Sequence, residues 1–259
     1  MTRMAAFQMQ PVCGDTDANL ARIGHAAKAA AEAGADLLVA PELALTGYGA
    51  GEAITALAEP ANGSQIDQLQ AISKANAIAI VAGFAERDGD HVYNSAALVC
   101  GDTPPAIYRK SHLYGDYERA LFTPAKPASC IVQLAGLKLG MLICYDVEFP
   151  ENVRRLAQAG AQMILVPTAL PAGPSGEFIA AHMIQVRAFE NQLFVAYVNH
   201  AGRDERFTFA GLSRIAAPDG SLIAACTDAN EQLFFADIDR HAFAASIDGN
   251  PYLKDLTRI

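Results

Sequence analysis

The chain alternates between short, wholly apolar runs and longer stretches in which apolar residues recur every three or four positions. The longer stretches predict amphipathic helices, and the short runs have the length of buried strands. Helices are expected at residues 15–33, 64–75, 151–159 and 178–191. Strands are expected at 4–10, 35–40, 78–85, 92–100, 106–110, 131–134, 137–144, 163–166 and 193–198, with a late hairpin around 218–220. This alternation predicts an α/β fold.

Two segments of the chain repeat one another. Residues 31–42 (AEAGADLLVAPE) align with residues 157–168 (AQAGAQMILVPT), and each contains a helix end, a glycine cap, a buried strand and a proline. The repeat indicates two similar halves, and therefore two sheets that face each other with helices outside. We expect a four-layer αββα sandwich in one domain spanning residues 1–259.

The segments between these elements carry weaker signals. A glycine-rich loop at 46–51 lacks the spacing of a dinucleotide-binding loop. A polar loop is expected at 111–128, and Pro104 and Pro105 separate two strands. The tail from Asn250 onward is polar and is expected to pack on another part of the protein.

Composition narrows the class of protein. The formal net charge is −9 and the charges are interspersed, which argues against nucleic-acid binding. No apolar run has transmembrane length and the N-terminus does not resemble a signal peptide, so no membrane partner is expected. The five cysteines are scattered without a CxxC pair, which predicts neither a disulfide framework nor a zinc site. These features predict a cytoplasmic protein.

Three reactive side chains follow apolar runs. Cys144 ends the run 141–143 and precedes a helix that opens at Pro150, a location where helix dipoles favour a thiolate. Glu42 and Lys110 also stand at strand ends. Each has a structural alternative, because a lone cysteine is commonly a core residue and a lone Glu or Lys commonly a solvated one. The spacing alone does not establish that the three meet.

Three motifs resemble those of the nitrilase superfamily of carbon–nitrogen hydrolases. They are Pro41-Glu42, the segment 108–113 (YRKSHL) and the segment 144–151 (CYDVEFPE). The resemblance extends over the whole chain and is closest to the bacterial aliphatic amidase branch, with 5-aminopentanamidase and the R-stereoselective amidases. It implies an αββα sandwich, a Glu–Lys–Cys triad and no metal or organic cofactor.

The resemblance also implies a role for each residue. Cys144 would be the nucleophile and Glu42 its general base. Lys110 and the backbone N–H of Tyr145 would stabilise the oxyanion. A further carboxylate would orient the substrate amide; Glu118, six residues before Pro124, matches its position better than Asp116 does. The usual Pro-Gly is here Pro124-Ala125. None of the six histidines lies in a protease motif.

The function that the resemblance implies is hydrolysis of a small linear carboxamide to a carboxylate and ammonia. An ω-amino amide such as 5-aminopentanamide is a specific expectation, because Asp116, Glu148 and Glu177 could pair with a cationic tail. The alternatives are an N-carbamoyl amino-acid amidohydrolase, an ω-amidase, a nitrilase and a non-catalytic binding module. A homodimer or higher homo-oligomer is expected from the family and from the apolar 251–253 segment.

Overall fold

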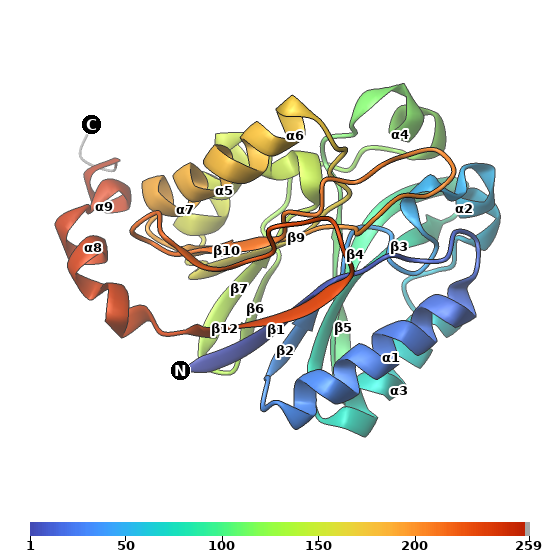
Figure 1. Ribbon diagram of the computed structural model, residues 1–259, viewed down its shortest axis with the longest axis horizontal. Helices are drawn as coiled ribbons and strands as arrows, with labels where there is room; N and C mark the ends of the chain where they lie inside the picture. Colours follow the sequence, from blue (N-terminus) through green and yellow to red (C-terminus); the bar gives the residue numbers. More distant parts are fainter. Residues whose placement is uncertain (257–259) are drawn as a thin grey trace.

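The computed structural model describes residues 1–256 and contains two six-stranded sheets packed face to face (Figure 1). The first sheet has the order β12-β1-β2-β3-β4-β5 and the second β11-β10-β9-β8-β7-β6. The three central strands of each sheet, β1 to β3 and β7 to β9, are parallel, and the outer strands are antiparallel.

The strands are β1 (Thr2–Gln8), β2 (Leu37–Val39), β3 (Ala79–Asp88), β4 (His91–Cys100), β5 (Thr103–Arg109), β6 (Ile131–Leu134), β7 (Leu137–Met141), β8 (Met163–Pro167), β9 (Phe194–Val198), β10 (Arg214–Ala216), β11 (Leu222–Ala225) and β12 (Gln232–Ile238). The α-helices are α1 (Thr16–Glu32), α2 (Glu52–Leu57), α3 (Ser64–Asn76), α4 (Gly115–Leu121), α5 (Pro150–Gln158), α6 (Pro174–Phe178), α7 (Ile184–Asn191), α8 (Ala244–Gly249) and α9 (Tyr252–Leu256). No helix within residues 1–256 is long and apolar enough to cross a membrane.

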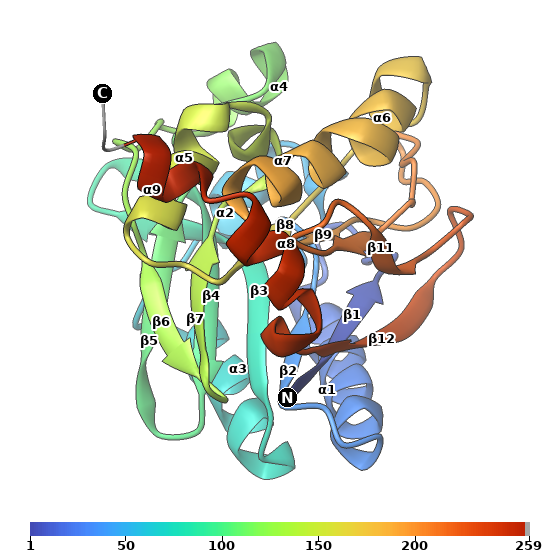
Figure 2. The same cartoon turned by 90° about the vertical axis from the view of Figure 1, so that its left-hand side faces the viewer.

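Successive side chains along the strands of the first sheet point to opposite faces, and each face belongs to a different hydrophobic core. Met4, Leu37 and Val81 face the second sheet, whereas Leu38 and Ile80 face α1 and α3 on the outside. Helices α5 and α7 cover the outer face of the second sheet, so that the layers run helix, sheet, sheet, helix (Figure 2). The expected αββα sandwich is confirmed. Burial of both faces explains why the central strands are wholly apolar.

The two repeated segments form the same structure. After α1 the N–H of Ala35 donates to Ala30, and after α5 the N–H of Ala161 donates to Leu156, at 2.9 and 3.0 Å. The intervening glycines, at positions 34 and 160, both have positive φ, which a glycine adopts at low cost. Each turn then leads into the second parallel strand of its sheet. The two halves predicted from the repeat are present.

Several elements differ from the sequence expectations. The loop 111–128 contains α4, and β12, which no pattern indicated, pairs with β1 along its whole length. Pro104 and Pro105 lie inside β5 and not between strands, because β5 is a sheet edge, where a missing N–H is tolerated. The helix expected at 178–191 starts earlier, at Pro174, and contains a π-helical turn, Ile179–Met183.

The chain end packs as expected over its described part. The ring of Tyr252 in α9 contacts Phe189 of α7 at a centroid distance of 5.9 Å, and Leu253 packs against the core. The last part of the expected tail, 257–259, lies outside the described residues.

Candidate active site

Cys144 lies in a strained turn at the carboxyl end of a central strand. β7 ends at Met141 and not at Cys144, where the strand was expected to end, because a 3₁₀ turn, Cys144–Glu148, follows. Cys144 has φ of 43°, in the left-handed region that non-glycine residues rarely adopt. The backbone of Ala169 faces its sulfur and lowers the pKa of the thiol, against the effect of burial. The buried thiol is therefore held in a fixed direction at the end of the sheet.

Glu42 is held by an equally tight turn after β2. The next residue, Leu43, has φ of 48°, and this turn lies directly on Gly83 of β3. A Cβ atom on Gly83 would lie 2.2 Å from the backbone nitrogen of Leu43, so that only glycine fits there. The Nε2 of His200 donates to the Glu42 carbonyl oxygen at 2.6 Å, which fixes the turn from the other sheet.

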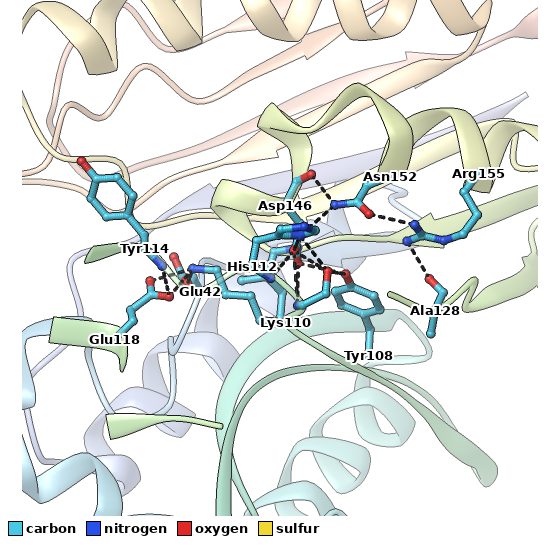
Figure 3. Close-up of polar contacts among 12 residues, drawn as sticks. Glu42, Tyr108, Lys110, His112, Tyr114, Glu118, Ala128, Asp146, Asn152 and Arg155 are labelled. Atoms are coloured by element: carbon cyan, nitrogen blue, oxygen red, sulfur yellow. Dashed lines mark hydrogen bonds and ion pairs between the residues drawn. The ribbon is translucent and has the colours of Figure 1, made fainter. Parts of the chain in front are cut away.

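Lys110 joins the two carboxylates at the centre of the site (Figure 3). Its Nζ lies 2.7 Å from Oε1 of Glu42 and 2.6 and 2.8 Å from the two oxygens of Glu118. All three side chains are fully buried. Glu118 also accepts hydrogen bonds from the Tyr48 hydroxyl and the Tyr114 N–H. Asp116 is exposed and pairs with Arg119, so of the two acids considered only Glu118 contacts Lys110.

Burial and charge set the protonation of this cluster. Burial, opposed by Lys110 and reinforced by Glu118, raises the pKa of Glu42 to about 7. Burial alone would lower the pKa of Lys110, but Glu118 and Glu42 outweigh it and raise that pKa well above its usual value. Burial and then Glu42 raise the pKa of the Cys144 thiol. At neutral pH the lysine is charged, the thiol is protonated and Glu42 is poised to exchange a proton.

One oxygen of Glu42 has no partner. Oε1 accepts from Lys110 and from Nδ2 of Asn94, both at 2.7 Å, whereas the buried Oε2 accepts no hydrogen bond within residues 1–256. A buried carboxylate oxygen without a donor is costly unless it serves a purpose. The carboxyl group acts electrostatically on the Cys144 thiol and raises its pKa.

Asp146 connects the segment that carries Lys110 to the turn that carries Cys144 (Figure 3). Its buried carboxylate accepts from the Tyr108 hydroxyl at 2.9 Å, the Ser111 hydroxyl at 2.7 Å and the His112 N–H at 2.9 Å. His112 stacks on Phe149 and contacts Asp146 through Nδ1. These bonds fix the position of Lys110 relative to Cys144.

The sequence reasoning missed several supporting residues: Tyr48, Asn94, Asp146 and His200. Asn94 could have been found, because it stands among the apolar residues of β4 as a buried polar group. His200 could not, since its contact with Glu42 spans 158 residues of sequence. Burial lowers its pKa to about 4, so the ring is neutral and Nε2 carries the proton it donates.

A cavity of about 410 Å³ opens above Cys144. Its walls are Tyr114, Tyr145, Glu148 and the segment 170–176, with Ile179 from the π-helical turn. The loop 47–51 does not line the cavity; it holds Tyr48 against Glu118 instead. Within residues 1–256 no three histidine, cysteine or acidic side chains are grouped so that they could hold a metal ion.

The fold and this site together define a carbon–nitrogen hydrolase, and the chain belongs to that family, whose pattern it matches over residues 3–247. More specifically, it is an amidase of the nitrilase superfamily. It is 36% identical over 245 residues to an (R)-stereoselective amidase from a Pseudomonas species, covering 93% of this chain and 86% of the relative. It is 44% identical over 258 residues to a hydrolase encoded in the pqqF 5′ region of Pseudomonas protegens, covering 98% and 88%.

The solved structures include a close match. An amidase from Nesterenkonia sp. AN1 superposes with a TM-score of 0.88 at 32% identity, covering 98% of this chain and 96% of that one. Structures of variants of that amidase show acrylamide attached to its active-site cysteine by Michael addition and, in another variant, bound butyramide.

Proposed function

We propose that the protein hydrolyses a small linear carboxamide to a carboxylate and ammonia through a thioester on Cys144. The observation that carries this proposal is the partnerless, buried Oε2 of Glu42 beside a buried thiol, with a charged lysine between two carboxylates. Cysteine is a strong nucleophile once a base removes its proton. The bound butyramide and the acrylamide adduct of the Nesterenkonia amidase support the substrate class.

The first half of the reaction forms the thioester. Glu42 takes the thiol proton as the sulfur of Cys144 attacks the amide carbon, and the oxygen becomes an oxyanion. Lys110 Nζ and the N–H of Tyr145 stabilise this charge, each contributing about 3 kcal/mol by analogy with other oxyanion donors. Glu118 orients the amide and holds Lys110. Collapse of the intermediate breaks the C–N bond, and Glu42 gives its proton to the departing ammonia.

The second half releases the acid. A water molecule gives a proton to Glu42 and attacks the thioester carbon, and the C–S bond breaks. The Cys144 sulfur regains the proton from Glu42, and the carboxylate leaves. Within this proposal the chain 1–259 acts as one hydrolase domain that needs no cofactor, and its reliance on a free thiol supports a cytoplasmic location.

Two measurements test the mechanism. Cys144→Ala should fold normally and release no ammonia, and acid-quenched wild-type protein should carry an acyl mass on Cys144. A coupled ammonia assay across amides, N-carbamoyl amino acids, keto-acid amides and nitriles separates the amidase from its alternatives. Appreciable turnover by Cys144→Ala would end the proposal, and turnover of nitriles alone would change the class of substrate.

We also propose that the protein forms a homodimer or a larger homo-oligomer. Val186 and Phe189 on α7 and Tyr252 on α9 remain 50%, 37% and 40% exposed, so that the chain end does not cover all of its apolar surface. Symmetric dimers commonly bury such faces. Light scattering at micromolar concentration should give at least twice 27.4 kDa, and a clean monomer would contradict the proposal.

A further inference from the structure

The cavity above Cys144 contains one carboxyl group and no cation among its lining side chains, as far as the described residues go. The carboxyl group is that of Glu148, four residues after the nucleophile. The other two acids considered as partners for a cationic substrate do not line the cavity. Asp116 is exposed and paired with Arg119, and Glu177 is exposed on α6. Only Glu148 is positioned to meet a bound substrate.

The carboxyl group of Glu148 is not committed to any other partner. In residues 1–256 no N–H or O–H group donates a hydrogen bond to it, although its side chain is partly buried. The two cations that act electrostatically on it already have partners. Lys110 is held by Glu42 and Glu118, and Arg187 donates to the carbonyl oxygens of Val147 and Glu148 and to Glu190. A half-buried carboxyl group without a partner favours a ligand that brings one.

The remaining walls suit an alkyl chain that ends in an ammonium group. Leu170, Pro171 and Ile179 offer apolar surface to methylene groups. The rings of Tyr114 and Tyr145 meet edge to face at 5.2 Å, and such aromatic faces attract an ammonium group. If the acyl chain ended in a carboxylate, Glu148 would repel it, and no cation among the described lining side chains would offset that repulsion.

We propose that Glu148 selects substrates by the charge of the acyl group, accepting amides whose acyl chain ends in an ammonium group and rejecting those that end in a carboxylate. This inference rests on the proposed function, because it assigns the acyl group to the cavity above Cys144. It identifies which of the three acids recognises an ω-amino amide, and it disfavours N-carbamoyl amino acids and keto-acid amides.

The selection should depend on pH. Burial raises the pKa of Glu148 to about 7, against the opposing effects of Lys110, which follows β5, and of Arg187 on α7. The hydroxyl of Tyr197 on β9 also acts on it, but burial raises the pKa of Tyr197 well above its usual value, so that this group is neutral near pH 7. An ω-ammonium group stays charged at that pH. The preference for a cationic over a neutral amide should therefore rise with pH up to about 7 and then level off.

Three amides of equal length test the proposal: 5-aminopentanamide, neutral hexanamide and anionic 6-amino-6-oxohexanoate. We expect wild-type kcat/KM at about pH 8 to be roughly tenfold or more higher for the cation than for hexanamide, and lowest for the anion. The ratio of cation to hexanamide should fall about tenfold between about pH 8 and 6. Because both amides use the same catalytic residues, the ratio of their kcat/KM values does not depend on the protonation of Glu42, Lys110 and Cys144.

Variants locate the effect. Glu148→Gln should bring the cation-to-hexanamide ratio close to one and remove its pH dependence, and Glu148→Asp should keep part of both. Glu177→Gln, which changes a nearby exposed acid, should leave both unchanged. A ratio near one in wild type, or a ratio that survives in Glu148→Gln, overturns the inference while hexanamide hydrolysis still supports the amidase.

Binding to the Cys144→Ala protein separates the two proposals. If wild type hydrolyses none of the amides but this variant binds 5-aminopentanamide about tenfold or more tighter than hexanamide, the proposed function fails and the charge selection stands. Equal binding of the two amides overturns the charge selection, whatever the turnover.

Discussion

Replacing Glu118 by glutamine tests how the buried cluster controls its own protonation. Glu118 has two effects on Glu42: it repels the ionised form directly, and it shares the charge of Lys110 with it. Glutamine keeps the size of the side chain and removes the charge. Loss of the repulsion and loss of the competition for Lys110 both favour the ionised form of Glu42, so that its pKa falls below about 7.

The geometry sets the size of the change. The carboxylates of Glu42 and Glu118 contact the same Nζ atom at 2.7 and 2.6 Å, so their oxygens lie within about 5 Å of each other. With an effective dielectric constant of about 20, two unit charges at that distance interact by about 3 kcal/mol, or about two pKa units. We expect a shift of about one to two units, together with a lower plateau rate because Lys110 loses a partner.

The assay is the pH profile of kcat/KM for a neutral amide, which reports the essential groups of the free enzyme. In wild type, activity should rise as Glu42 ionises near pH 7, and in Glu118→Gln the same rise should occur at lower pH. Asp116→Asn, an exposed acid two residues away, should leave the profile in place. An unmoved or upward-shifted acid limb in Glu118→Gln would refute the assignment of that limb to Glu42.

Three further results are expected. Lys110→Arg should lose most activity, because the planar guanidinium cannot replace a compact ammonium group between two carboxylates, and an imine trapped at this position by borohydride would contradict its electrostatic role. Gly83→Ala should destabilise the protein by about 2 kcal/mol or more in urea unfolding, because the added methyl group meets the backbone of Leu43; an unchanged midpoint would show that the Glu42 turn can move aside. Glu148→Gln should add about 1–2 kcal/mol of stability at about pH 8.5, after allowance for solvent screening, and almost none at about pH 5. The reason is that the pKa of Glu148 is raised in the folded state, so that its ionisation destabilises the wild-type fold as pH rises from about 4.5 to about 7. Equal unfolding midpoints of variant and wild type at the higher pH would count against this effect of burial.

The sequence predicted the central strands and the layers because these depend on local periodicity. The runs that form β2 and β8 are wholly apolar, and the repeated glycine turns that precede them can be recognised in the amino-acid sequence. β12 was not predicted because its identity as a strand depends on pairing with β1, which lies some 230 positions away and leaves only alternate residues buried. Long-range pairing of this kind has no local signal.

The site could be predicted only in part, because its motifs are local in the sequence whereas the burial of its side chains is not. The residues Glu42, Lys110 and Cys144 could be proposed from motifs, but the complete burial of Lys110 between two carboxylates could not, since a charged residue at a strand end is ordinarily exposed. Glu118 lies on a helix of seven residues inside a polar segment, too short for a periodic pattern to indicate its buried face.

The two repeated halves have a consequence for the number of sites. The aligned segments match Glu42 with Thr168, and the strand registers match Cys144 with Met9. Glu42 therefore comes from the end of the second parallel strand of the first half, whereas Cys144 comes from the turn after the first parallel strand of the second half. The counterpart positions hold a threonine and a methionine, neither of which exchanges a proton at neutral pH. In the proposed mechanism, a scaffold with twofold repetition thus places its nucleophile and its general base in different halves, and neither half contains both.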